Sequence, residues 1–196
     1  MAKYISLTIL LLLCNLTCFA QKIQKLEGEA SLGITIPLGI TIPLGNYHNG
    51  EKLVGPEFGL ELRYNIPQTA WDCGLALNVS TAVYKYYESP KTDWYWEQSN
   101  RSINIMAVGD YNFKQGSKFN PYLGIGIGLS LYDAVNEVLY KSSGVSFVFR
   151  PRIGIELFRH LRIGVFSTIA KTGYNNFGIS IGGVIGGRPK KEIHAY

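Results

Sequence analysis

Few side chains in this sequence could do covalent chemistry, and the best candidates lie in two polar segments. His48 could act as a general base, while Ser89 offers a hydroxyl nucleophile beside the acid Glu88. Nucleophilic catalysis needs such a hydroxyl within hydrogen-bond reach of a base. Nothing in the spacing of these three residues favours that arrangement over solvated loop positions. The sequence therefore predicts no catalytic residues and a protein that is not an enzyme.

A second set of residues could form ion pairs. It combines four acids with four bases, all on the same face of segments in which polar and apolar residues alternate. These residues are Glu57, Glu61, Arg63, Asp110, Arg150, Arg152, Glu156 and Arg162. Buried charges persist when they are paired and hydrogen-bonded. If this face borders a narrow interior, the balanced signs predict a salt-bridged plug. A narrow porin-like channel for small solutes is the alternative.

A third candidate site is an aromatic cluster in the predicted loop 86–100, which reads YYESPKTDWYWEQSN. It contains Tyr86, Tyr87, Trp94, Tyr95 and Trp96. Tyrosine and tryptophan are enriched at binding hot spots, so the cluster predicts recognition of an extracellular ligand or a host surface. Anchoring at a bilayer interface and packing against neighbouring loops are the alternatives.

The elements that must position these side chains are strands, because alternation recurs after residue 26 without a sustained helical period. In the segment 121–132, PYLGIGIGLSLY, leucine and isoleucine occupy one parity while glycine and serine occupy the other. Neighbouring strand residues point to opposite faces, so this segment has one aliphatic face and one nearly bare face. Eight strands are predicted, at 32–44, 55–66, 71–85, 101–113, 121–133, 145–158, 161–172 and 176–187.

The connections between these strands alternate in length. Short turns at 65–70, 114–120 and 159–160 separate longer segments at 46–54, 86–100 and 134–144. Membrane barrels have short periplasmic turns and longer outer loops. The strand face with the smaller side chains is largely Gly, Ser, Ala and Asn. These residues would solubilise a barrel poorly if they faced outward, but they would fit a tight lumen. The sequence therefore predicts an all-β fold, an eight-stranded antiparallel up-and-down transmembrane β-barrel.

The amino terminus predicts the compartment. Lys3 precedes an apolar run that is too short for an ordinary spanning helix and ends in Cys18-Phe19-Ala20, which is the pattern of a secretory signal peptide. We expect Sec-type export, cleavage after Ala20, a single barrel domain over 21–196 and localisation in the cell outer membrane. A lipoprotein site at Cys18 is the alternative, although Asn15 stands where a lipobox has leucine.

Signal removal also limits the possible partners. Cys73 is then the remaining cysteine, so the sequence predicts no internal disulfide, no cysteine metal cluster and no cofactor. The formal charge falls from +5 to +4 with the loss of Lys3, and the remaining basic residues are scattered apart from a short terminal cluster. We expect outer-membrane lipid and lipopolysaccharide as partners, and no nucleic acid.

One internal repeat, GITIPL, occurs at 33–38 and again at 39–44. Because six is even, either copy can occupy the wall without changing the face of any other residue. If the second copy lies in the membrane, Glu27 and Glu29 sit at or below the periplasmic mouth. If the first copy does, they enter the lumen and make it acidic. The compact loop 46–54 favours the second copy.

Several segments carry a resemblance to a known family: a signal ending FAQK, the run IPLGNY, PYLGIGIGLSLY and a closing FGISIGGVIGGRPKK. Together they resemble the outer-membrane β-barrel domain family common in Bacteroidetes. The resemblance covers the mature chain and implies an OmpA/OmpX-like barrel without a peptidoglycan-binding domain. Some barrels of this architecture deacylate or palmitoylate lipid A, and such an enzyme is the less favoured alternative to a structural or surface-recognition role.

Overall fold

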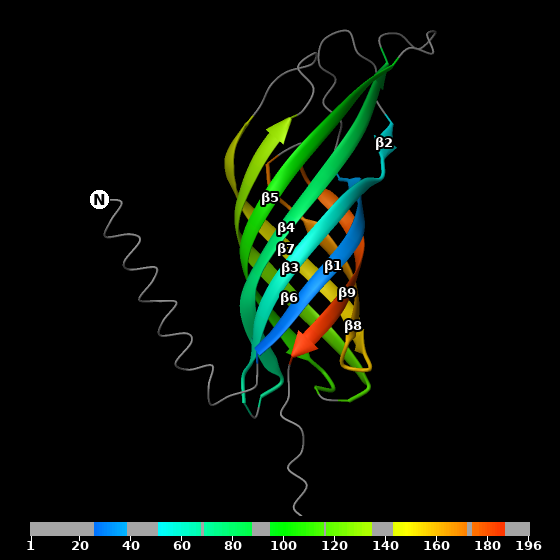
Figure 1. Ribbon diagram of the computed structural model, residues 1–196. Coiled ribbons are helices and arrows are strands. Elements are labelled where there is room, and N and C mark those ends of the chain that lie inside the picture. The colour runs from blue at the N-terminus through cyan, green and yellow to red at the C-terminus, as the bar shows by residue number, and fades with distance from the viewer. Residues whose placement is uncertain are drawn as a thin grey trace, which may run out of the picture.

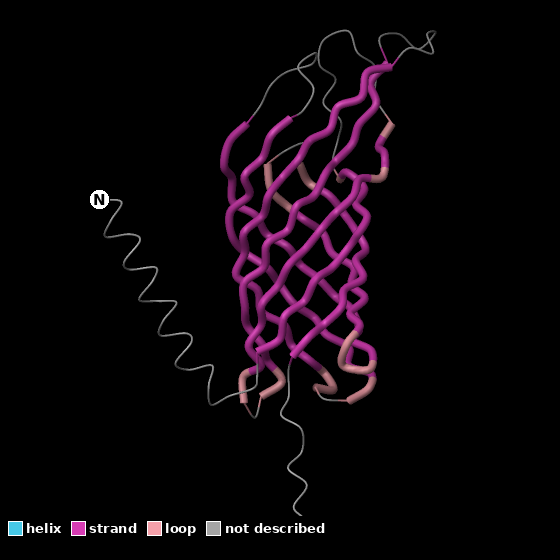
Figure 2. The backbone as a smooth tube through the Cα atoms, in the orientation of Figure 1, coloured by secondary structure: helices cyan, strands magenta, loops and turns pink. Residues whose placement is uncertain are grey.

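The computed structural model shows a tilted, closed β-barrel (Figures 1 and 2). It describes residues 26–38, 51–67, 69–87, 95–115, 117–134, 143–171 and 174–186. The predicted signal peptide, the second GITIPL copy and Trp94 lie outside these residues. Within them, no helix is long and apolar enough to cross a membrane.

Eight long strands build the wall, and a ninth, two-residue strand is added at one edge. The long strands are β1 (Leu26–Pro37), β3 (Gly55–Asn65), β4 (Trp71–Tyr87), β5 (Tyr95–Asn112), β6 (Phe119–Ala134), β7 (Ser143–Leu157), β8 (Leu161–Thr168) and β9 (Asn176–Gly186). The short strand β2 (Lys52–Leu53) pairs with β4. The eight-stranded antiparallel barrel predicted from the sequence is confirmed.

Each long strand pairs with its neighbours in sequence, and β1 closes the barrel by pairing with both β3 and β9. Leu32, for example, stands opposite Phe58 on one side and Ile181 on the other. Short turns join β3 to β4, β5 to β6 and β7 to β8 at one end, which we call the turn end. The opposite end, where the longer connections start, is called the loop end. By the usual construction of such barrels the turn end is periplasmic.

The first strand differs from its prediction by one repeat unit. It spans Leu26–Pro37 instead of 32–44, so the first GITIPL copy lies in the wall and the preference for the second copy was wrong. The Thr35 hydroxyl, which is fully buried, donates to the carbonyl oxygens of Gly55 (3.2 Å) and Thr81 (2.8 Å). These bonds hold the first copy against β3 and β4. Glu27 and Glu29 share the inward parity of Thr35 and therefore lie in the lumen.

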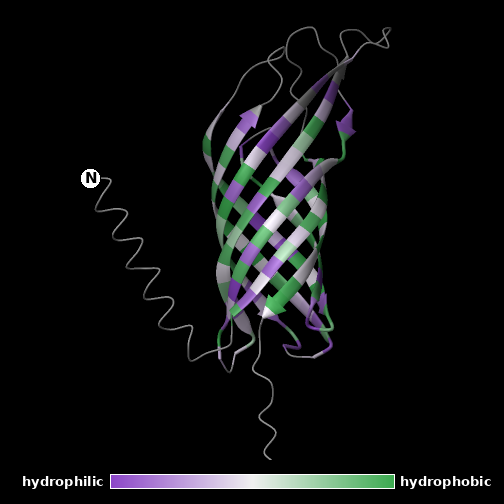
Figure 3. Ribbon diagram, viewed as in Figure 1, coloured by the Kyte–Doolittle hydropathy of each residue, from purple (hydrophilic) through white to green (hydrophobic). Residues whose placement is uncertain are grey.

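The two faces of the wall have different compositions, as Figure 3 shows by the alternation of hydrophobic and hydrophilic residues along the strands. The outward parity is aliphatic and exposed: Leu129 is 56% exposed and Ile125 is 50% exposed. The inward parity is polar or small, with Asn104 and Asp110 fully buried. This reverses the arrangement of a soluble protein and matches a barrel whose outside meets lipid.

Strands β4 and β5 continue past the rest of the loop end (Figure 1). Their pairing runs to Tyr86 opposite Trp96 and Tyr87 opposite Tyr95, whereas β3 accompanies β4 only as far as Ser80. The sequence prediction of one loop over 86–100 was therefore wrong. Aromatic residues fit a paired, pleated ribbon well, so the strands extend into the segment that composition alone had assigned to a loop.

Candidate functional site

The lumen contains the largest concentration of charged residues in the described chain. Seven acids occupy lumen-facing strand positions, namely Glu27, Glu29, Glu57, Glu61, Asp72, Asp110 and Glu156, together with four arginines, Arg63, Arg150, Arg152 and Arg162. The predicted balance of four against four was wrong, because Glu27 and Glu29 on β1 and Asp72 on β4 add three acids to the lumen. The lumen is therefore acidic.

Arg152 on β7 forms the centre of the main ion-pair network. Its Nε donates to Oδ1 of Asp110 at 2.8 Å, and its Nη2 donates to Oδ2 of the same carboxylate at 2.9 Å. The guanidinium also donates to both carboxylate oxygens of Glu61, at 2.5 and 2.8 Å. One side chain thus joins β7 to β5 and to β3 across the interior. Fork-shaped contacts of this kind are among the stronger hydrogen bonds in proteins.

Two further arginines complete this network. Arg162 on β8 donates to Oδ2 of Asp110 at 2.6 Å, and its guanidinium lies 3.6 Å from the ring centroid of Tyr122. Arg63 on β3 is 1% exposed and lies 3.1 Å from Glu29 and 3.4 Å from Glu61. Arg152, Arg162 and Arg63 each contact more than one acid, so this network is held by shared rather than isolated pairs.

A second ion pair lies closer to the loop end. Arg150 on β7 forms a two-pronged contact with Glu57 on β3, and both side chains are buried. Arg150 Nη1 also donates to the Thr168 hydroxyl on β8 at 3.2 Å, while the guanidinium stacks 3.5 Å from the centroid of Phe166. The Arg150 guanidinium is therefore held by a carboxylate, a hydroxyl and an aromatic ring.

Glycines on the inward face leave the room that these large side chains occupy. A Cβ placed on Gly124 would overlap the Asp110 carboxylate, and one placed on Gly154 or Gly164 would come within 2.6 Å of the Tyr122 hydroxyl. The alternation of glycine with aliphatic residues in β6, and the single glycines Gly154 in β7 and Gly164 in β8, therefore have a packing purpose, because the bare inward positions accept side chains from other strands. The space left among the arginines is a polar cavity of about 30 Å³.

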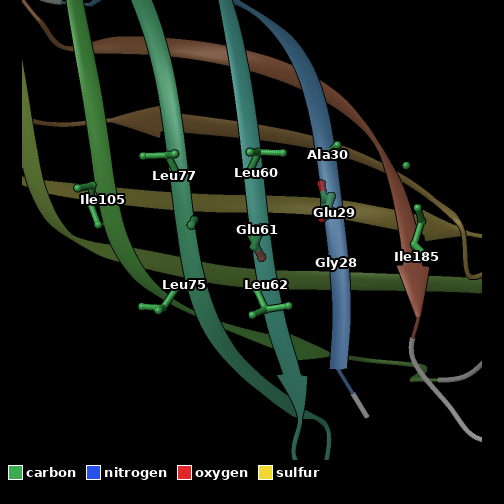
Figure 4. A pocket seen from close by; sticks show the side chains of 12 residues that line it. Gly28, Glu29, Ala30, Leu60, Glu61, Leu62, Leu75, Leu77, Ile105 and Ile185 are labelled. Carbon is green, nitrogen blue, oxygen red and sulfur yellow. The ribbon is translucent and has the colours of Figure 1, made fainter. Parts of the chain in front are cut away.

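A larger hollow lies on the outer surface of the wall. It has a volume of about 500 Å³ and is almost entirely apolar. Figure 4 shows the leucine side chains that stand around its floor, which Gly28 and Ala30 form: Leu60, Leu62, Leu75 and Leu77. It faces the lipid side of β1, β3 and β4, and Glu29 and Glu61, whose side chains belong to the lumen parity, also border it. Among the described residues, no set of three or more acids, histidines or cysteines is arranged to hold a metal ion.

The structure places the other predicted residues as follows. Glu156 is half-buried and stands opposite Arg162 and Asn120 in neighbouring strands. The backbones of Tyr86, Tyr87 and Trp96 belong to the β4–β5 ribbon, while Tyr95 is 46% exposed with Lys85 Nζ 4.5 Å from its ring centroid. His48, Glu88 and Ser89 lie outside the described residues, as does Trp94.

One outward-facing hydroxyl near the loop end was missed by the sequence reasoning. Ser167 belongs to the outward parity of β8 and is half-buried, and its hydroxyl donates to the Asn176 carbonyl at 3.4 Å. The β7–β8 ladder is interrupted beside it, between the Arg152–Phe166 and Phe149–Ile169 pairs, where Pro151 has no N–H to donate. The sequence offered only a proline within the predicted strand 145–158 and a serine among the aliphatic residues of 161–172, and their opposition is visible only in the register of the structure.

A closed eight-stranded barrel with an aliphatic outside and a polar inside defines the class, an outer-membrane β-barrel protein. A model of the lipid A 3-O-deacylase (PagL) family matches residues 34–165, which are 132 of the 196 residues. The chain therefore belongs to the lipid A 3-O-deacylase family. A search among curated protein sequences gave no significant match.

One solved structure supports the fold, and two further ones are similar at lower scores. Neisserial surface protein A has a TM-score of 0.51 and 16% identity, with 82% of this chain and 96% of that chain covered. The outer-membrane enzyme PagL has a TM-score of 0.46 and 15% identity, covering 81% and 98%. The attachment invasion locus protein Ail of Yersinia pestis has a TM-score of 0.43 and 14% identity, covering 82% and 97%.

The family assignment corrects one prediction. The sequence reasoning expected a protein that is not an enzyme, because His48, Glu88 and Ser89 showed no favourable spacing. The match to a deacylase family overturns that expectation. His48, Glu88 and Ser89 lie outside the described residues, so the correction rests on the family match.

Proposed function

We propose that this protein acts on lipid A in the outer leaflet and removes a 3-O-linked acyl chain. The observation that carries the proposal is the family match over residues 34–165, which includes most of the barrel wall. The packing of the lumen supports a reaction on the outer surface, because ion pairs and a cavity of about 30 Å³ leave no room inside for an acyl chain.

Ser167 is the nucleophile that this proposal favours. An ester of an outer-leaflet lipid reaches the wall from outside, near the loop end, so its attacking group must face outward there. Among the described outward positions of β8, β9, β1 and β3, Ser167 carries the one aliphatic hydroxyl, and the phenol of Tyr64 lies at the turn end. The described histidine, His160, lies at the turn end. The base is then expected from His48, which the sequence predicts in the first connection at the loop end.

Lipid A analysis tests the proposal. The full chain is expressed in a Gram-negative host whose lipid A retains its 3-O-linked chains, and lipid A is examined by mass spectrometry. We expect a species lighter by one acyl chain. Ser167→Ala and His48→Ala should each abolish it, because hydrolysis needs both the nucleophile and its base. Ser143→Ala, which removes an exposed hydroxyl at the loop end of β7, is the matched control and should retain activity.

Two outcomes would contradict different parts of this proposal. Unchanged lipid A with a folded wild-type barrel, shown by heat-modifiable gel migration, would remove the proposed activity. An active Ser167→Ala variant would preserve the activity and remove the assigned nucleophile.

For the lumen we propose a closed plug. The ion pairs of the lumen support this proposal, because Arg152 and Arg63 each contact more than one carboxylate. An eight-stranded barrel is only wide enough for its own side chains to fill it. Steady ion-selective channels formed by the wild-type protein in planar bilayers would contradict the plug and favour the porin-like alternative.

A second candidate function is recognition at the cell surface, and the extended β4–β5 ribbon favours it. The ribbon carries Tyr86, Tyr87, Tyr95 and Trp96 beyond the last residue of β3 that pairs with β4. Replacing Trp94 and Trp96 by alanine should reduce attachment of expressing bacteria to cultured epithelial cells while leaving the barrel folded. Loss of assembly in this variant would instead indicate that the tryptophans anchor the protein.

A further inference from the structure

The turn end carries a strained turn that displays two large side chains. Phe158 and Arg159, between β7 and β8, both have positive φ angles, of 54° and 66°. The His160 N–H donates to the Leu157 carbonyl at 3.1 Å, which closes a β-turn around them. Two central residues with positive φ define a type I′ turn, which normally takes Asn-Gly. A bulky aromatic and an arginine are unfavourable there.

Strained conformations persist where the side chains serve a purpose. Phe158 is 67% exposed, and Arg159 is exposed beside it. A turn selected only for connecting two strands would use residues that accept this geometry without cost. The side chains of Phe158 and Arg159 are therefore the feature to explain.

A neighbouring turn adds basic and aromatic side chains to the same surface. The Phe158 N–H donates to the Lys118 carbonyl at 2.7 Å, which ties the β7–β8 turn to the β5–β6 turn. Lys114 and Lys118 are both exposed in that second turn. Phe113 and Phe119, which flank it, are 60% and 49% exposed.

The charge of this end is one-sided. The described turn residues include Lys114, Lys118 and Arg159 but no aspartate or glutamate, and the acids nearest in sequence, such as Asp72 and Glu156, lie on the lumen side of their strands. At the loop end, by contrast, exposed acids such as Glu51 and Asp133 accompany the exposed bases.

We propose that the β5–β6 and β7–β8 turns form a binding site for the headgroup of an anionic phospholipid in the periplasmic leaflet. Lys114, Lys118 and Arg159 contact the phosphate, while Phe113, Phe119 and Phe158 lie at the boundary of the acyl chains. Aromatic side chains collect at membrane interfaces, and basic clusters near a leaflet surface attract anionic lipids. The three basic side chains favour a lipid with a net negative charge over a zwitterionic lipid.

Native mass spectrometry can measure the preference directly. The purified barrel is incubated in micelles with equal amounts of phosphatidylglycerol and phosphatidylcholine, and the lipids that remain bound are counted. We expect wild type to retain at least about five times as much phosphatidylglycerol as phosphatidylcholine. This ratio corresponds to the attraction of one basic side chain to an anionic membrane surface. The preference should fall as salt rises, because added ions screen exposed charges.

Two variants with equal charge changes locate the site. K114Q/K118Q/R159Q should lower the ratio towards one. The matched control K52Q/R101Q/K171Q removes three exposed cations from the loop end and should leave the ratio unchanged. An unchanged ratio in the turn variant, or an equal loss in the control, would overturn the proposal.

A third variant separates binding from a structural role. F158N/R159G supplies the residues that a type I′ turn prefers, so it should unfold at a higher urea concentration than wild type and still lose preference for phosphatidylglycerol. If the variant retains the preference, the strained side chains do not bind the headgroup. Purified peptidoglycan sacculi test a different partner. If wild type shows no preference for phosphatidylglycerol but binds sacculi, and K114Q/K118Q/R159Q abolishes that binding, the surface recognises cell-wall carboxylates and the proposal is overturned.

Discussion

Arg150 and Glu57 meet across the lumen although 93 residues separate them in the chain, and Arg150 Nη1 lies 3.1 Å from Glu57 Oε2. The two side chains come from β7 and β3, which occupy opposite positions in the closed order of strands. This pair spans the barrel, whereas the backbone hydrogen bonds join only neighbouring strands. It therefore couples two parts of the wall that have no contact through the ladder.

Removing one partner of this pair should destabilise the barrel strongly. Glu57→Ala leaves the Arg150 guanidinium buried without its carboxylate, and such a change typically costs about 3–5 kcal/mol. Urea titration in lipid vesicles, followed by heat-modifiable gel migration, measures the loss. The control is Glu51→Ala, because Glu51 is exposed and lies 4.0 Å from Lys85, so it should cost less than about 1 kcal/mol. Equal effects of the two variants would show that the buried pair adds no more stability than the exposed one.

An inward glycine, Gly124, and an outward one, Gly183, should differ sharply in their tolerance of a methyl group. Gly124→Ala places a Cβ against the Asp110 carboxylate, which is fixed by Arg152 and Arg162 and cannot move without breaking those pairs. Overpacking of this kind costs about 1–3 kcal/mol. Gly183→Ala meets nothing within 4 Å and should be nearly neutral. Thermal unfolding of both variants checks the difference, and a similar loss in both would contradict the packing role of Gly124.

The sequence was sufficient for the architecture because alternation, glycine placement and connection length all point to the same fold. Six of the eight predicted strands begin within two residues of their observed starts, and the inward parity of the charged residues follows directly from the strand period. The first strand was displaced by one repeat because an insertion of six residues preserves parity. Periodicity alone cannot choose between two copies that differ by an even number.

The partners within the lumen could not be derived in the same way. Parity places Arg152 inside the barrel, but its contacts with Asp110 and Glu61 depend on strand tilt and on the register of strands far apart in sequence. The acidity of the lumen likewise depended on the position of the first strand, which decided whether Glu27 and Glu29 entered it. Ser167 was overlooked because a single serine among aliphatic residues carries no motif.

Among the outward-facing positions, those near the membrane midplane should be destabilised most by a charged residue. Ile127 lies near the centre of β6 and is 46% exposed on the outward face. Ile127→Arg should cost about 2–4 kcal/mol in a bilayer, because a cation at the membrane midplane loses its hydration. Ile127→Leu keeps the apolar surface and should be nearly neutral. Equilibrium unfolding in lipid vesicles measures both, and an arginine that is tolerated would contradict the assignment of this face to lipid.

Arg152 should control whether ions can cross the closed lumen. Its removal takes away the donors that hold Asp110 and Glu61, and it leaves three arginines against seven lumen-facing acids. Arg152→Ala also adds volume beside the cavity that Arg152 lines. We expect this variant to show cation-selective openings in planar bilayers, since the uncompensated carboxylates attract cations, while wild type stays closed. The control Arg101→Ala removes an exposed, outward arginine and should also stay closed. Anion-selective openings in Arg152→Ala would contradict the acidic lumen, and a closed variant would show that the remaining pairs are enough to seal it.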